Sequence, residues 1–417
     1  MKDVAAFVLA GGRVQEMGVL THRRAKAALP IAGHYRIIDF AMSNLARAGV
    51  NRVGVLSQYR PSSLMDHVRL GAPWGLIGRG REVRILSPFQ AENAVDWYLG
   101  TADAVSQNLS FLKDEKWVMV VSGDHIYEMD YQWLFKQHMD ADADLTMVFK
   151  RFPQGDCQRF GNVRVGQDNR ILEYAEKPEE PLSDLGSLTI YLFKREALER
   201  TLKKSVREQP DRHQLVDTVI PELVRKGQVQ AAIFKDYWAY ARDVDDYYAT
   251  SMDLLDPSAD FDPGKWDIQT NAEQSGIGDV PPAWIGRQAD ITNSLISPGA
   301  RVFGSVRRSV LSPGVIVEEG ATVVDSVLFH GVKVAAGACL NRVVADKHVR
   351  FEKGATVGHC KGALSNRLAP GCQAGGVTVL GRQVHILADV AVGANCQIAP
   401  ETTVPERTVV PDGENLS

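Results

Sequence analysis

Cysteine is scarce in this chain of 417 residues, where Cys157, Cys339, Cys360, Cys372 and Cys396 are scattered and odd in number. No two of them form a C-x-x-C pair, so we expect neither a disulfide framework nor a zinc site, and a reducing cytoplasm fits. An excess of one charge sign is also lacking, because the formal net charge is −4. The charge therefore gives no reason to expect binding to nucleic acid or to a membrane surface.

Long apolar runs are absent too, since none approaches the roughly 20 residues of a membrane-spanning helix. The short apolar run Val4–Leu9 lies close to the start and has no small-residue cleavage site after it. We interpret this run as a buried strand and not as a signal peptide. A chain of this length exceeds one ordinary core, so the sequence predicts two domains of a soluble, cytoplasmic protein.

The first 255 residues alternate between strand and helix patterns. Strands are expected at Val4–Leu9, Arg52–Leu56, 118–121 and 145–149, and a helix at Ile38–Arg47. This alternation predicts an α/β domain with a doubly wound, mostly parallel sheet. Because ligands of such sheets bind at the carboxyl ends of the strands, we expect the motifs at those ends to converge.

The texture of the sequence changes twice after this domain. Residues 256–284 are broken by proline and glycine, which predicts a linker. Residues 285–417 then show short apolar pairs about every six residues, with small residues between them. This rhythm predicts a left-handed parallel β-helix.

One motif near the N-terminus identifies a family. Leu9-Ala10-Gly11-Gly12 ends the first expected strand, and Arg24-Ala25-Lys26 and Tyr35-Arg36-Ile37-Ile38-Asp39-Phe40 follow. This stretch resembles the N-terminal loop of sugar-nucleotide pyrophosphorylases, most closely the ADP-glucose pyrophosphorylase (glucose-1-phosphate adenylyltransferase) family. The resemblance implies a Rossmann-like nucleotidyltransferase domain followed by a β-helix that supports oligomer contacts.

The loop departs from the family pattern at its centre. The family sequence is Gly-Gly, any residue, Gly-(Ser/Thr)-Arg-Leu, and its arginine grips the nucleotide phosphates. The matching positions here are Val14, Gln15, Glu16 and Met17. A carboxylate, Glu16, thus stands where the family has its phosphate-binding cation.

The resemblance implies a nucleotide site at Leu9, Gly11, Gly12, Gln90, Tyr98, Gly100, Thr101 and Ala102, with Lys26 near the phosphates. It implies that Asp124 binds Mg²⁺ when nucleotide is bound. From the residues alone, a tight turn explains Gly11-Gly12 equally well, and Asp124 could be a helix N-cap.

The resemblance also implies a sugar-phosphate site at Gly161, Glu176, Lys177 and Ser187, with Lys26, Asp124 and Lys177 as the catalytic groups. Two family residues are replaced there: a glycine by Thr189 and a lysine by Asp217. The second metal-binding aspartate is replaced by Tyr240 in the ungapped match, unless Asp243 takes its place after a shift of three residues.

Family members bind phosphate or sugar-phosphate effectors at basic residues. The matching positions imply an allosteric site at Arg36 and Arg52, with Gln58 and His67 nearby. These residues could equally be ion-pairing groups of the surface.

Three functions remain open. The first is a regulatory subunit of ADP-glucose pyrophosphorylase in glycogen or starch synthesis, weak or inactive in catalysis, that binds ATP, ADP-glucose or sugar phosphates. It would join a catalytic paralogue in a heterotetramer, or form a homotetramer. The second is an active adenylyltransferase rebuilt on Asp124, Asp243 and Lys177. The third is a stand-alone sensor of nucleotide or sugar phosphate.

Overall fold

The computed structural model describes residues 1–12, 14–88, 97–208, 211, 213–273, 279–358 and 365–417. The chain divides into two compact units, which we describe separately. The sheet unit consists of Met1–Gly12, Phe40–Pro61 and Val68–Trp238. The β-helix unit consists of Arg13–Asp39, Ser62–His67 and Ala239–Ser417. Domain limits at residues 255 and 284 stay predictions.

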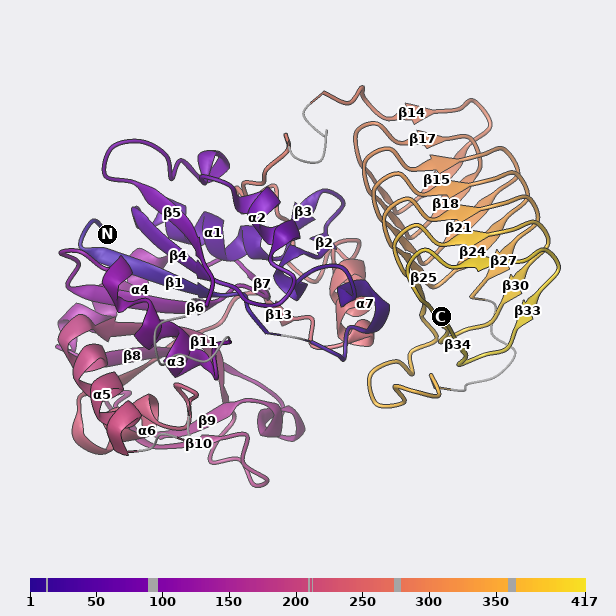
Figure 1. The fold of residues 1–417 in the computed structure, drawn as a ribbon. Coiled ribbons are helices and arrows are strands. Elements are labelled where there is room, and N and C mark those ends of the chain that lie inside the picture. Colours follow the sequence, from indigo (N-terminus) through magenta and orange to yellow (C-terminus); the bar gives the residue numbers. More distant parts are fainter. Residues whose placement is uncertain (13, 89–96, 209–210, 212, 274–278, 359–364) are drawn as a thin grey trace. The chain divides into compact units, whose positions relative to one another are not determined.

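The sheet unit is built on one nine-stranded sheet (Figure 1). Its strands are β1 (Val4–Leu9), β4 (Arg52–Leu56), β5 (Glu82–Leu86), β6 (Trp117–Ser122), β8 (Leu145–Arg151), β9 (Gly161–Val165), β10 (Ile171–Glu176), β11 (Leu185–Lys194) and β12 (Val229–Phe234). Strand β1 pairs in parallel with β4 and β6, and β5 continues in parallel on β4. Strand β11 runs antiparallel to β6 and β8. The predicted mostly parallel α/β fold is confirmed.

The helices are α1 (Ile38–Arg47), α2 (Ser62–Val68), α3 (Thr101–Gln107), α4 (Tyr131–Asp140), α5 (Arg195–Glu208), α6 (Val219–Lys226) and α7 (Val244–Asp253). Helix α4 shows why these segments are helical and amphipathic. The Asp130 side chain caps its first turn by accepting a hydrogen bond from the Gln132 N–H. Its buried residues Tyr131, Leu134 and His138 recur at helical spacing, so that one face packs on β8.

Residues 284–417 form a hexapeptide β-helix of three parallel seven-stranded sheets (Figure 1). The first sheet consists of β14 (Trp284–Ile285), β17 (Arg301–Val302), β20 (Ile316–Val317), β23 (Lys333–Val334), β26 (Arg350–Phe351), β29 (His385–Ile386) and β32 (Thr403–Val404). The second consists of β15 (Asp290–Thr292), β18 (Ser305–Arg307), β21 (Thr322–Val324), β24 (Cys339–Asn341), β27 (Thr356–Val357), β30 (Ala391–Val392) and β33 (Val409–Val410). The third consists of β16 (Leu295–Ile296), β19 (Val310–Leu311), β22 (Val327–Leu328), β25 (Val343–Ala345), β28 (Thr378–Leu380), β31 (Gln397–Ile398) and β34 (Asn415–Leu416).

The six-residue rhythm places valine, leucine and isoleucine side chains inside the coils, where they form one continuous core. One corner of the coils carries a ladder of serines. The Ser326 N–H donates to Ser309 Oγ, and the Val343 N–H donates to Ser326 Oγ, in each case across 17 residues. These side chains satisfy backbone donors that would otherwise be buried without a partner.

The loop that follows residue 13 belongs to the β-helix unit. The side chain of Gln397, on β31, accepts a hydrogen bond of 3.1 Å from the Val19 N–H. Gly18 has a φ of +51°, and a Cβ atom there would lie 2.1 Å from Gln397 Oε1. Only glycine therefore suits position 18. The loop that carries Glu16 is thus held by a specific contact with the coils.

The segment between β27 and β28 is an excursion from the coils, and its described part begins at Ser365. Two fully buried amides, Asn366 and Gln373, anchor this described part. Asn366 Nδ2 donates to the Asn395 carbonyl, and Gln373 Nε2 donates to the carbonyls of Val377 and Cys396. Strand β25 pairs directly with β28, so the coils continue in register past the excursion.

Candidate functional site

The predicted site residues fall in both units. In the sheet unit, the carboxyl ends of β1, β4 and β6 lie together, as the parallel pairing requires. The Gly123 N–H donates to the Leu9 carbonyl at 2.9 Å. A Cβ atom on Gly11 would lie 3.3 Å from the Gln58 nitrogen, so the backbones of β1 and β4 meet closely here. Gly12 has open space at the same point.

Gln58 holds Tyr98 by its backbone. Its Oε1 accepts a hydrogen bond of 2.7 Å from the Tyr98 N–H, and its Nε2 donates to the Tyr98 carbonyl at 3.5 Å. The Tyr98 hydroxyl donates to the Leu86 carbonyl at the end of β5. Tyr98 is buried, whereas its neighbour Trp97 is 54% exposed. Gln58 therefore serves the predicted nucleotide segment, and its allosteric role stays a prediction.

The start of α3 carries the predicted Gly100, Thr101 and Ala102. Gln214 Oε1 accepts hydrogen bonds from both the N–H and the hydroxyl of Thr101, and the His213 carbonyl accepts the Ala102 N–H. A Cβ atom on Gly100 would lie 2.4 Å from that carbonyl oxygen, which explains the glycine. These N–H groups bind protein acceptors, so this helix start is not an open cradle for phosphate.

Asp124 follows β6 and precedes β7 (His125–Tyr127). It is half-buried, it accepts a hydrogen bond from the Ser122 hydroxyl, and its Oδ1 lies 3.6 Å from His125 Nε2. A carboxylate at a strand end suits Mg²⁺, which proteins bind through one or two carboxylates together with substrate phosphates. Asp124 thus fits a metal ion that arrives with nucleotide.

Aromatic rings connect Asp124 with the predicted sugar residues. The ring of His125 lies 4.9 Å from that of Trp238, which lies 5.8 Å from that of Phe160. Phe160 precedes Gly161, and its carbonyl accepts the Lys177 N–H. The structure thus brings Gly161 and Lys177 to the same side of the sheet unit as Asp124.

In the β-helix unit, Lys26 and Tyr240 lie together. The Lys26 ammonium is 3.9 Å from the centre of the Tyr240 ring, and Lys26 is only 3% exposed. The face of an aromatic ring attracts a cation, most strongly where water is excluded. The ring of Tyr240, at the end of β13 (Trp238–Tyr240), thus covers the lysine, and the replacement of a family carboxylate by Tyr240 stays a prediction.

Glu16 and Asp243, two further residues of the predicted site, differ in exposure. Glu16 is exposed on the loop held by Gln397. Asp243 is buried, and both of its oxygens have protein partners: Oδ1 caps α7 through the Asp246 N–H, and Oδ2 pairs with Arg242 at 2.7 Å. Within the described ranges, no group of three or more histidine, cysteine or acidic residues could hold a metal ion. Both oxygens of Asp243 are thus engaged within the protein, and its role as a second metal ligand stays a prediction.

A buried group of basic residues includes the predicted Arg36, and the sequence did not indicate its other members as effector residues. Arg24 and Arg36 are each 3% exposed, and Arg24 forms two hydrogen bonds of 2.8 Å with buried Asp346. Burial, together with Arg36 and Arg24, lowers the pKa of Lys347 to about 6. Burial and the charges of Arg36 and Lys347 also lower the pKa of His330 far below its ordinary value. We call these four basic residues the cationic cluster. Its charge at neutral pH is carried by Arg24 and Arg36, beside the carboxylates of Asp346 and Asp39, because the pKa values of Lys347 and His330 are lowered.

His330 and Lys347 lie some three hundred residues from Arg24, and no local pattern marks them. The other predicted effector residues have different partners. The Arg36 N–H donates to Asp39 Oδ2, and His67 Nε2 lies 2.5 Å from Asp39 Oδ1. Arg52, in the sheet unit, forms ion pairs with Glu82 and Glu115. The allosteric roles of Arg52 and His67 stay predictions.

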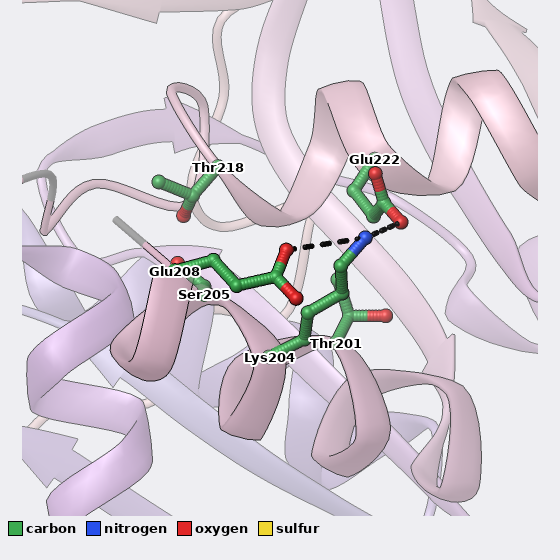
Figure 2. Close-up of a pocket in the computed structure, with 6 residues that line it drawn as sticks. All are labelled: Thr201, Lys204, Ser205, Glu208, Thr218 and Glu222. Carbon is green, nitrogen blue, oxygen red and sulfur yellow. Dashed lines mark hydrogen bonds and ion pairs between the residues drawn. The ribbon is translucent and has the colours of Figure 1, made fainter. Parts of the chain in front are cut away.

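A small cavity between α5 and α6 is no candidate. It measures about 20 Å³, close to the size of one water molecule. Its lining is dominated by Lys204, which pairs with both Glu208 and Glu222 (Figure 2). The predicted residue Gln90 lies outside the described residues.

Comparison with known proteins decides the family. A model of the nucleotidyl transferase family matches residues 5–257, and a GlmU-like, C-terminal hexapeptide model matches residues 282–380. A glucose-1-phosphate adenylyltransferase of Fervidobacterium nodosum is 34% identical over 423 residues, with 100% of both chains covered. The chain belongs to the glucose-1-phosphate adenylyltransferase family.

Other relatives with this description agree with this assignment. The protein of Thermotoga neapolitana is 38% identical over 405 residues, covering 95% of this chain and 94% of its own. The protein of Thermomicrobium roseum is 38% identical over 428 residues, covering 100% and 98%. No described helix is both long and apolar enough to cross a membrane.

Proposed function

We propose that this chain is a regulatory subunit of glucose-1-phosphate adenylyltransferase with weak or no catalysis of its own. The reaction joins ATP and glucose 1-phosphate to give ADP-glucose and pyrophosphate, in glycogen or starch synthesis. The observation that carries the proposal is the Tyr240 ring over the Lys26 ammonium, 3.9 Å from its centre. A position that should hold a carboxylate for metal instead covers a phosphate-binding lysine.

The charge at Glu16 acts in the same direction. Phosphoryl transfer depends on cations placed around the leaving pyrophosphate. Losing one such donor typically costs about 10²–10³-fold in rate. A carboxylate about 4 Å from a phosphate oxygen adds a repulsion of about 4 kcal/mol at an effective dielectric constant of 20. Both replacements would therefore weaken catalysis.

Regulation is supported by the cationic cluster. Arg24 and Arg36 supply buried positive charge beside the carboxylates of Asp346 and Asp39, and His330 and Lys347 add nitrogen donors. Arginine and lysine in such a setting bind phosphate through charge-assisted hydrogen bonds. We infer that the cluster binds a phosphate or sugar-phosphate effector.

The partner is then a catalytic paralogue in a heterotetramer, with a homotetramer as the alternative assembly. Nucleotide, ATP or ADP-glucose, would still bind at the ends of β1, β4 and β6, with Mg²⁺ held by Asp124. Lys177 and Glu176 would face the sugar phosphate.

Pyrophosphate release by the purified chain alone, with ATP, glucose 1-phosphate and Mg²⁺, tests this function. We expect turnover that is absent or orders of magnitude below the usual enzyme range of about 1–10³ per second. Turnover within that range would refute the regulatory role and support an active enzyme. Addition of a paralogue with an intact Gly-(Ser/Thr)-Arg-Leu loop should restore ADP-glucose synthesis in the mixture.

A further inference from the structure

Strand β11 contains a residue in an unfavourable backbone conformation. Thr189 has a φ of +52°, in the left-handed region that a β-branched residue rarely adopts. The pairing of β11 with β8 explains where this strain arises. Ser187 pairs with Phe149 and Tyr191 with Met147, so β11 carries extra residues between two positions that are close on β8. Thr189 lies within this bulge.

The side chain of Thr189 belongs to a group of hydroxyls. Burial raises the pKa of Tyr191 to about 12, and hydrogen bonds from the Ser187 and Thr189 side chains oppose that rise. The Thr189 N–H also donates to Ser187 Oγ at 3.4 Å. Ser187 and Tyr191 are buried whereas Thr189 is half-buried, so Thr189 is the accessible end of this group.

The next strands add a carboxylate to these hydroxyls. The Tyr174 hydroxyl donates a hydrogen bond of 2.5 Å to Glu176 Oε2. Burial, and then the neighbouring Tyr191 and Glu176, raise the pKa of Tyr174 above its ordinary value. A Cβ atom on Gly161 would lie 2.4 Å from the Tyr174 hydroxyl, so there is no room even for a methyl group beside it. The space around these polar groups is narrow.

A second strained residue lies at the same place. Lys177, next to Glu176, has a φ of +44°. Non-glycine residues in this region persist only where their surroundings fix them, and they gather at ligand sites. Two such residues flank one cluster of hydroxyls and carboxylate, the chemistry that recognises a sugar.

We propose that Thr189 is a specificity-determining residue that narrows the sugar subsite of this chain and keeps its affinity for glucose 1-phosphate low. The inference rests on the proposed function, since it assumes that Glu176 and Lys177 face a sugar phosphate. The strained backbone at Thr189 holds its side chain in the subsite. Glycine would relieve the strain and open the space together.

Three variants separate strain from space. Thr189→Gly removes both the strain and the side chain, Thr189→Ala keeps the strain but removes the hydroxyl, and Thr189→Asn eases the strain but keeps bulk. Glucose 1-phosphate binding to the full chain is measured by calorimetry, and unfolding by thermal denaturation. Asn169→Gly, at another left-handed position with a φ of +60° in the turn between β9 and β10, is the matched control.

We expect Thr189→Gly to bind glucose 1-phosphate about tenfold more tightly or better, as the removal of one or two carbons from a pocket allows. Its Tm should rise by about 2–6 °C. Thr189→Asn should gain Tm without affinity, and Asn169→Gly should leave affinity unchanged.

Equal affinity of Thr189→Gly and the natural chain, including binding by neither, would overturn the inference and leave Thr189 a structural residue. The affinity comparison is independent of turnover. High turnover of the natural chain would remove the regulatory role and leave the Thr189 result standing, whereas low turnover with equal affinities would do the reverse.

Discussion

Lys26 and Arg24 lie two residues apart in the β-helix unit, and their side chains have different surroundings. Lys26 lies under the ring of Tyr240, with one aromatic face against its ammonium. Arg24 and Arg36 join His330 and Lys347 in the cationic cluster. Lys26 is therefore covered by an uncharged ring, whereas Arg24, two residues earlier, pairs with a carboxylate beside other basic side chains.

On the proposed function, the difference teaches that divergence here has acted on charge more than on the fold. The chain keeps the nucleotidyl transferase and hexapeptide architectures of the family. The proposed replacements at Tyr240 and Glu16 should cost the fold little, because Tyr240 is half-buried and Glu16 is exposed. Losing Arg24 would be costly, since its partner Asp346 is buried.

The largest effect is expected from Glu16→Arg combined with Tyr240→Asp, which would make the Lys26 site resemble that of the family. Since each missing group is worth about 10²–10³-fold in rate, turnover should rise by about 10²-fold or more. Pyrophosphate release from ATP and glucose 1-phosphate with Mg²⁺ measures it. Glu401→Arg, an exposed charge reversal on a coil corner, is the control.

If the double variant shows no increase in turnover, the loss of the two charged groups does not explain the low activity expected of this chain. That result would mean that Thr189 and Asp217 limit catalysis, or that Asp243 already holds the metal.

A stability measurement tests the buried pair of Arg24 and Asp346. Arg24→Met leaves the Asp346 carboxylate buried without its partner, and such a loss typically costs about 3–5 kcal/mol. Arg23→Met, one residue earlier, removes an ion pair with Glu401 whose side chains are 48% and 56% exposed, and should cost about 0–1 kcal/mol. Denaturant unfolding of both variants gives the contrast. Similar losses would show that the Arg24 pair is not buried in solution.

Proton uptake tests whether the cluster binds anions. The pKa of Lys347, lowered to about 6 in the fold, lies below its ordinary value of 10.5. The unfolded chain therefore binds more protons between these values, and this lysine makes stability rise as pH rises from about 6 to 10. Bound phosphate would raise the pKa of Lys347, opposing the effects of Arg24, Arg36 and Arg382 and adding to that of Asp346.

Calorimetry of inorganic phosphate binding at pH 7.5, in buffers of different ionisation enthalpy, should thus show net uptake of up to about one proton. Lys347→Met should abolish the uptake and weaken binding, whereas Lys353→Met, on the neighbouring stretch of coil, should change neither. Binding without proton uptake would place the phosphate away from Lys347.

The smallest effect concerns the loop that carries Glu16. Gln397→Ala removes the acceptor of the Val19 N–H, which should cost about 1 kcal/mol of stability. It should also speed hydrogen exchange at Val19 without changing exchange in the coils beyond β31. Unchanged exchange at Val19 would show that the loop is held by its other contacts, such as that of Arg24 with Asp346.

Much of the fold could be predicted because local sequence patterns determine its strands, helices and coils. Val4–Leu9, Ile38–Arg47 and Arg52–Leu56 have the predicted limits, since apolar periodicity and glycine turns decide them. The coils followed from their six-residue rhythm. The position of Asp124 after β6 was predicted from the strand pattern, whereas its role in binding metal stays a prediction.

The site could be predicted only in part, because partners distant in sequence decide its chemistry. The sequence around Lys26 does not predict its contact with Tyr240, and the sequence around Arg36 does not predict that Lys347 lies near it. Arg52 was assigned by matching position, yet strand register sets it beside Glu82. At Thr189 the sequence indicated extra bulk, but its backbone strain depends on the pairing of β11 with β8.

The excursion between β27 and β28 has a consequence for the history of the chain. Its described part, from Ser365 onward, is tied to the coils by two buried amides, Asn366 and Gln373, while β25 and β28 stay paired. Lengthening such a loop costs little, about 0.6 kcal/mol for each doubling. This corner is therefore a place where evolution can insert or delete chain, and where an engineer can graft a foreign peptide, as long as the two amides are kept.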